Sequence, residues 1–147
     1  PPRLEPLVDE RPLSAIEWIQ SDALLTQFET TSVVILNFTL QFIPIDARLR
    51  LLKAIRRAMV PGGLLILSEK LTMADPAMDA LMIDLHHDFK RSQGYSDLEI
   101  AQKRDAIDNV LIPETAQIHT ARLADAGFSR SSIWFQCLNF ASFIAIA

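Results

Sequence analysis

VVILNFTLQF at Val33–Phe42 and PGGLLILSEK at Pro61–Lys70 decide the fold of this 147-residue chain. Val33–Leu36 is a continuous apolar run rich in β-branched residues, which predicts a strand buried on both faces, as in a parallel sheet. Leu64–Leu67 is a second such run. Between them, apolar residues recur at helical spacing over Asp46–Met59. Strand, helix and strand of these lengths predict a βαβ unit with two parallel strands and a right-handed crossover.

Polar residues follow both predicted strands. Asn37 comes after the first run, and Ser68-Glu69-Lys70 come after the second. Ligands of open α/β sheets bind beyond the carboxyl ends of the strands, so Asn37 is a candidate ligand contact, although such a residue can also be a turn former. We expect Pro61-Gly62-Gly63 to end the intervening helix.

The N-terminal segment has weaker patterns. Residues 1–15 contain several prolines and are expected to be an irregular lead-in, with 16–147 forming part of one domain. Ile16–Ile19 alternates in hydropathy and predicts a short strand. Ala23–Thr31 fits either a loop or one helical turn.

Three helices are predicted after Lys70. Asp75 is a good N-cap with Pro76 at the first helical position, and an apolar stripe predicts that this helix packs against the core. The stripe consists of Met78, Leu81, Met82, Leu85 and Phe89. Ser96–Glu99 is a capping box for a second helix that reaches about Asn109, and Pro113 is expected to start a third that ends at Gly127.

The C-terminal segment predicts an antiparallel hairpin. Ile133–Cys137 and Phe143–Ile146 are its expected strands, connected through Asn139-Phe140-Ala141. The whole order is that of an α/β fold, the second half of a doubly wound, Rossmann-like sheet closed by the hairpin. The helices that begin at Asp75 and Ser96 stand between the strands at Leu64–Leu67 and Ile133–Cys137, which are the fifth and sixth strands of a complete sheet of this kind, where a plain α/β domain has one helix.

Composition excludes several classes of function. The net charge of −4 argues against a surface that binds duplex nucleic acid or an anionic membrane. Cys137 is the single cysteine, which fits a reducing compartment, and we expect it to be an inert core thiol. His86 and His87 are adjacent and point to different helix faces, so we expect no metal site there.

Five stretches together resemble carboxy-S-adenosyl-L-methionine synthases, a family with a class I S-adenosylmethionine methyltransferase-like fold. They are LNFTLQF (36–42), LSEK (67–70), HHDFKR (86–91), GYSDLEIAQKR (94–104) and WFQCLNF (134–140). The resemblance extends from Ile16 to the C-terminus. It implies an enzyme that converts S-adenosylmethionine and prephenate to carboxy-S-adenosylmethionine and phenylpyruvate, through a sulfonium ylide that captures the carbon dioxide lost by prephenate.

The resemblance also implies partners and site residues. Family members are cytoplasmic homodimers whose product serves an enzyme that modifies wobble uridines of transfer RNA. Asp22 and Ala23 match the positions that contact the adenine, and Asn37 matches an asparagine that contacts the cofactor. Arg104 matches the arginine that binds the carboxylate of the product, a task for which a planar guanidinium suits better than lysine. Without the resemblance, Arg104 would be interpreted as a solvated helix residue.

Other charged residues have two interpretations. Asp88 with Lys90-Arg91 forms either a surface cluster or a contact for the carboxylates of prephenate, and Tyr95 could reach the same cleft. The chain contains no Gly-x-Gly, so the glycine-rich turn of the family is absent, and we expect the chain to be a C-terminal portion of a family member. Two further hypotheses are therefore that the chain is an ordinary S-adenosylmethionine-dependent methyltransferase or that it is an inactive fragment. We also expect the edge of the Val33 strand to be unpaired.

Overall fold

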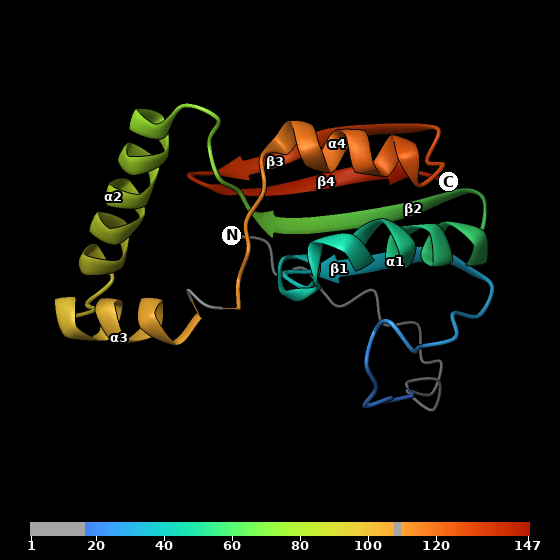
Figure 1. The fold of residues 1–147 in the computed structure, drawn as a ribbon, viewed down its shortest axis with the longest axis horizontal. Coiled ribbons are helices and arrows are strands. Elements are labelled where there is room, and N and C mark those ends of the chain that lie inside the picture. The colour runs from blue at the N-terminus through green and yellow to red at the C-terminus, as the bar shows by residue number, and fades with distance from the viewer. Residues whose placement is uncertain (1–16, 108–109) are drawn as a thin grey trace, which may run out of the picture.

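The computed structural model describes residues 17–107 and 110–147, which form a four-stranded mixed sheet and its covering helices (Figure 1). The strand order is β1-β2-β4-β3. Strands β1 (Thr31–Asn37) and β2 (Met59–Lys70) are parallel, whereas β4 (Phe140–Ile146) is antiparallel to both β2 and β3 (Arg130–Cys137). The predicted α/β class, parallel pair and C-terminal hairpin are confirmed.

Helix α1 (Ile45–Ala58) connects β1 to β2, as the periodicity predicted. The prediction that Pro61-Gly62-Gly63 ends this helix is wrong, because these residues lie inside β2. Met59 is already extended and pairs with Thr31 before a register shift in the ladder. A Cβ on Gly63 would lie 2.9 Å from the Ser32 carbonyl oxygen, so glycine here permits close approach of two strands.

Three further helices follow β2. The predicted Asp75 cap of α2 (Pro76–Ser92) is present, since its Oδ1 accepts a 2.9 Å hydrogen bond from the Met78 amide. The capping box of α3 (Asp97–Ile107) is also confirmed: Ser96 and Glu99 bond reciprocally. Helices α2 and α3 extend away from the sheet, and we call them the α2–α3 arm (Figure 1).

Helix α4 (Ala116–Asp125) begins later than predicted. Thr115 is its N-cap, and its side chain accepts a hydrogen bond from the Ile118 amide. Pro113 does not start the helix, because the next residue, Glu114, forms a bridge with Leu71 at the end of β2. The hairpin turn is likewise shorter than predicted, since Phe140 already belongs to β4.

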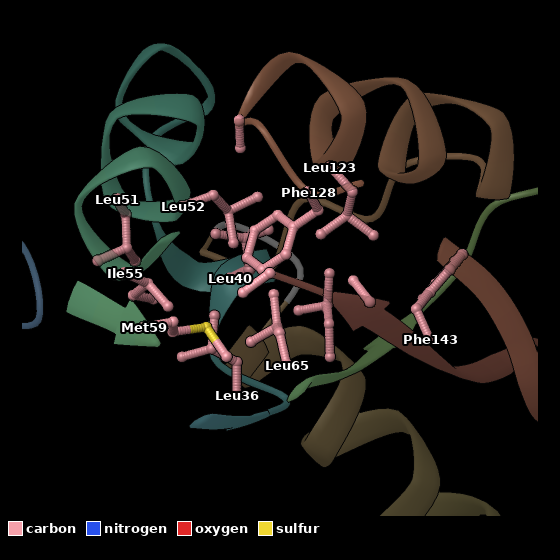
Figure 2. Packing of buried hydrophobic residues seen from close by; sticks show 14 of the residues in the cluster. Leu36, Leu40, Leu51, Leu52, Ile55, Met59, Leu65, Leu123, Phe128 and Phe143 are labelled. Atoms are coloured by element: carbon pink, nitrogen blue, oxygen red, sulfur yellow. The ribbon is translucent and has the colours of Figure 1, made fainter. Parts of the chain in front are cut away.

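The hydrophobic core lies between α1, α4 and one face of the sheet (Figures 1 and 2). Leu52, Ile55, Leu65, Leu123 and Phe143 are fully buried there. The opposite face of β1 exposes Val33 and Ile35 by 49% and 63%. The prediction that this strand is buried on both faces is therefore wrong for this chain, because in the described residues β1 is covered on one face of the sheet.

Three other sequence predictions are wrong. Residues 17–19 of the expected strand at Ile16–Ile19 are irregular, and Trp18 is 94% exposed; residues 1–16 lie outside the described part. Helix α2 has no buried residue, so its apolar stripe does not pack on the core. Cys137 is exposed, as are most residues of β3, so it is not a core thiol. Within the described ranges, no helix is long and apolar enough to cross a membrane.

Candidate functional site

The carboxyl ends of the two parallel strands form the candidate site. β1 and β2 end at the same edge of the sheet, where the chain leaves toward α2 (Figure 1). Asn37 is the last residue of β1, lies opposite Ser68 and is exposed. Phe38 follows with a φ of +51°, unusual for a residue with a side chain, and its amide donates to the Ser68 carbonyl at 2.8 Å.

Glu69 fixes the segment after Asn37. Its carboxylate is fully buried and accepts two 2.9 Å hydrogen bonds, from the backbone amides of Leu40 and Gln41 in the short 3₁₀ helix η1 (Leu40–Phe42). The Gln41 side chain accepts in return from the Lys70 amide at 2.9 Å. Burial raises the pKa of Glu69 to about 7, although the two amides and the Arg48 guanidinium favour the charged form.

A buried ion network lies behind η1. Arg48 from α1 is fully buried and donates to the carbonyls of Gln41, Ile43 and Ile112 at 2.9–3.0 Å. It is also paired with Glu114, whose carboxylate accepts from the two terminal nitrogens, Nη1 and Nη2, of Arg122. Burial by itself would raise the pKa of Glu114, but the bonds from the two arginines lower it. The network joins η1, α1 and α4.

Aromatic rings connect the site to the α2–α3 arm. The Phe140 ring lies edge-on to Phe38 and to His86, with centroids 5.8 and 4.9 Å apart. Burial, with the nearby cations Lys90 and Lys70, lowers the pKa of His86 to about 4. His86 is therefore neutral near pH 7. Its ring lies against Phe140, which in turn lies against Phe38, the residue after Asn37.

Arg104 lies in a hollow of about 290 Å³ on the arm. The lining comprises His87, Arg91, Asp97, Ile100, Ala101 and Arg104. Arg91 is tied to Asp97 at 2.8 Å and to Asp88 at 2.6 Å, which supports the interpretation of these residues as a charge cluster. The hollow thus contains two guanidinium groups, of which that of Arg91 is paired with carboxylates, beside the apolar side chains of Ile100 and Ala101.

Asp22 and Ala23 lie in a turn on another part of the chain. The Asp22 Oδ1 accepts from the Leu24 amide at 2.8 Å, and its carbonyl accepts from Leu25 and Thr26. Ala23 packs against the core cluster. The lining of the Arg104 hollow includes neither of these residues nor Asn37, so the four predicted contacts do not meet in one pocket.

The sequence interpretation did not single out the buried polar residues Gln41, Arg48, Glu69 and Glu114. One pattern could have found Arg48: it shares a helix face with Leu52 and Ile55, which lie four and seven positions later. Glu69 likewise ends an apolar strand on the side of Leu65 and Leu67. In residues 17–107 and 110–147, no three His, Cys, Asp or Glu residues gather as metal ligands do.

The sequence is similar to those of several curated bacterial proteins. The chain is 53% identical over 137 residues to a carboxy-S-adenosyl-L-methionine synthase of Geobacter sp. (strain M21), covering 93% of this chain and 56% of that protein. It is 58% identical over 134 residues to the Pseudomonas paraeruginosa synthase, covering 91% and 53%. The chain is similar to the carboxy-S-adenosyl-L-methionine synthases. It spans about half the length of these curated relatives.

Solved structures agree on the fold of this synthase-like chain. Human N-acetylserotonin methyltransferase in complex with SAM matches with a TM-score of 0.58 at 16% identity, over 94% of this chain and 35% of that one. An O-methyltransferase family 2 protein from Planctomyces limnophilus matches at 0.58 and 15%, over 86% and 33%. At such identities the likeness concerns the methyltransferase fold alone. No protein-family model matches the chain.

Proposed function

We propose that the protein to which this chain belongs is a carboxy-S-adenosyl-L-methionine synthase. One observation supports this above all: 52–58% identity to synthases along 86–93% of the chain. The proposed reaction takes S-adenosylmethionine and prephenate to carboxy-S-adenosylmethionine and phenylpyruvate. In this reaction prephenate loses carbon dioxide and its ring hydroxyl, the methyl carbon on sulfur loses a proton that leaves with the hydroxyl as water, and the ylide so formed bonds to the carbon dioxide.

The proposed cofactor contacts have suitable chemistry. Asp22 presents an exposed carboxylate that can accept from an exocyclic amine, and the Ala23 amide can donate to a ring nitrogen. Asn37 ends a strand at the edge where ligands of such sheets bind. The Asp22 carboxylate also has a structural role, since it accepts a hydrogen bond from the Leu24 amide in its own turn.

Arg104 is the proposed contact for the transferred carboxyl group. Its hollow is also lined by the guanidinium of Arg91, which is itself paired with Asp88 and Asp97. A guanidinium can bind a carboxylate through two parallel hydrogen bonds. Since the hollow contains no other proposed contact, we further propose that two copies of the protein associate and complete the site. The proposed assembly is a cytoplasmic homodimer whose product is consumed by a transfer RNA wobble uridine modifying enzyme.

Calorimetric titration tests the proposal. The intact protein should bind the carboxy derivative more tightly than S-adenosylmethionine, and Arg104→Ala should remove that preference, with Arg104→Lys restoring little of it. Lys103→Ala is the matched control, an exposed cation on the same helix. Equal affinity for both ligands in the wild type would instead favour an ordinary methyltransferase, and absence of binding to either would favour an inactive protein.

A further inference from the structure

We infer that Glu69 is a positioning residue for the cofactor site: its ionised carboxylate holds the segment after β1, and thereby Asn37, in its binding geometry. The inference rests on the proposed function, because it concerns the role of Asn37 as a cofactor contact. Glu69 itself is fully buried and is not expected to touch the ligand.

The geometry of the contact depends on charge. Both oxygens of Glu69 accept from backbone amides, those of Leu40 and Gln41, at 2.9 Å. An ionised carboxylate only accepts hydrogen bonds, whereas a protonated one has an O–H that must donate. Protonation therefore leaves one buried amide without a good acceptor, which is costly in a protein interior.

Phe38, the residue next to Asn37, has a strained backbone conformation that can relax when the Glu69 hydrogen bonds are lost. Only Phe38 and Thr39 separate Asn37 from the two amides, and Phe38 has a φ of +51°. A bulky residue keeps such a conformation only where its surroundings impose it. When Glu69 is protonated and its hydrogen bonds to η1 weaken, we expect the backbone of Phe38 to adopt a less strained conformation and Asn37 to move with it.

The surroundings of Glu69 allow it to titrate near neutral pH. Arg48 on α1 is the charged group that acts on it, and Arg48 is itself engaged by Glu114. Lys70, next along β2, points to the other face of the sheet. From η1 and the residue before it, the backbone amides of Thr39, Leu40 and Gln41 favour the charged form. With the pKa raised to about 7, the ionised fraction falls from roughly nine-tenths at pH 8 to one-tenth at pH 6.

The experiment measures separately the hydrogen bonds that Glu69 accepts and their effect on the affinity for S-adenosylmethionine. The amide resonances of Leu40 and Gln41 are followed by NMR from pH 5.5 to 8.5, and the affinity of the intact protein for S-adenosylmethionine is measured over the same range. We expect both amides to titrate together, and the affinity to weaken about tenfold from pH 8 to pH 6 with the same midpoint. Glu69→Gln should abolish both dependences, while Glu29→Gln, which changes an exposed glutamate, should keep them.

Each other outcome has a defined meaning. Amides that do not titrate, or that titrate equally in Glu69→Gln, would overturn the inference. If the amides titrate but the affinity for S-adenosylmethionine does not change with pH, the positioning role is overturned. No binding at any pH would refute the proposed function and the positioning role together, and the amide titration would then show whether Glu69 acts on η1 alone. If Glu69→Gln does not fold, the shared midpoint in the wild type decides.

Discussion

Replacing Arg48 by methionine should unfold this domain more readily than any exposed substitution on the same helix. The guanidinium is fully buried, makes three hydrogen bonds to backbone carbonyls and is paired with Glu114. Methionine fills similar space but removes this donor from three backbone carbonyls and removes one of the two arginines paired with Glu114. Removing one partner of a buried ion pair costs about 3–5 kcal/mol of unfolding free energy.

Urea denaturation measures this loss. With a slope of about 2 kcal/mol per molar urea for a domain of this size, a loss of about 4 kcal/mol moves the midpoint down by about 2 M. Arg50→Met is the matched control, an exposed arginine on α1, and should change the unfolding free energy by less than about 0.5 kcal/mol. Arg48→Lys should fall between the two, because lysine keeps the charge but cannot reach all four acceptors at once.

The reasoning would be refuted by a specific result. If Arg48→Met cost less than about 1 kcal/mol, the buried guanidinium would be contributing no more than an ordinary neutral hydrogen bond. The network would then be a consequence of the packing of η1, α1 and α4 rather than a cause of it.

Three smaller predictions follow from local geometry. Gly63→Ala should lower the melting temperature and the unfolding free energy, the latter by about 1–3 kcal/mol, because the new Cβ would lie within 3.0 Å of the Ser32 and Val60 carbonyl oxygens. An unchanged melting temperature would show that the backbone of the two strands can shift to make room for the methyl group. His86 should stay neutral down to about pH 4 in an NMR titration, and a midpoint near 6.5 would mean that its ring is solvated. Asp75→Ala should cost about 1 kcal/mol of helix stability and speed amide exchange in the first turn of α2, with no change in α4.

Local patterns predicted the parts of the fold that depend on neighbouring residues. The Asp75 cap and the Ser96 capping box involve groups three positions apart, so the sequence alone could place them. The βαβ unit followed from two apolar runs separated by one helical stripe. Pro61-Gly62-Gly63 was misread because the same residues suit a helix end and a bulged strand, and the choice between them depends on a partner strand that is distant in the sequence.

Burial was harder to predict than secondary structure. The apolar runs of β1 and α2 show what each element could bury, but the layer that would cover them is not specified by their own residues. Of the candidate site, Asn37 was placed at the correct sheet edge. The faces on which Glu69 and Arg48 lie could be predicted, but their partners could not, because some of them are 28 to 66 residues away in the sequence. The ligand roles of Asp22, Ala23, Asn37 and Arg104 stay predictions.

The way Arg48 is satisfied has a consequence for how this sequence can diverge. Three of its acceptors are backbone carbonyls, which every amino acid supplies. Substitutions at Ile43 and Ile112 can therefore accumulate without disturbing the network, provided that the backbone keeps its path. Selection falls instead on the pair of side chains, so Arg48 and Glu114 should be kept or lost together among descendants of this chain, while the positions around them drift.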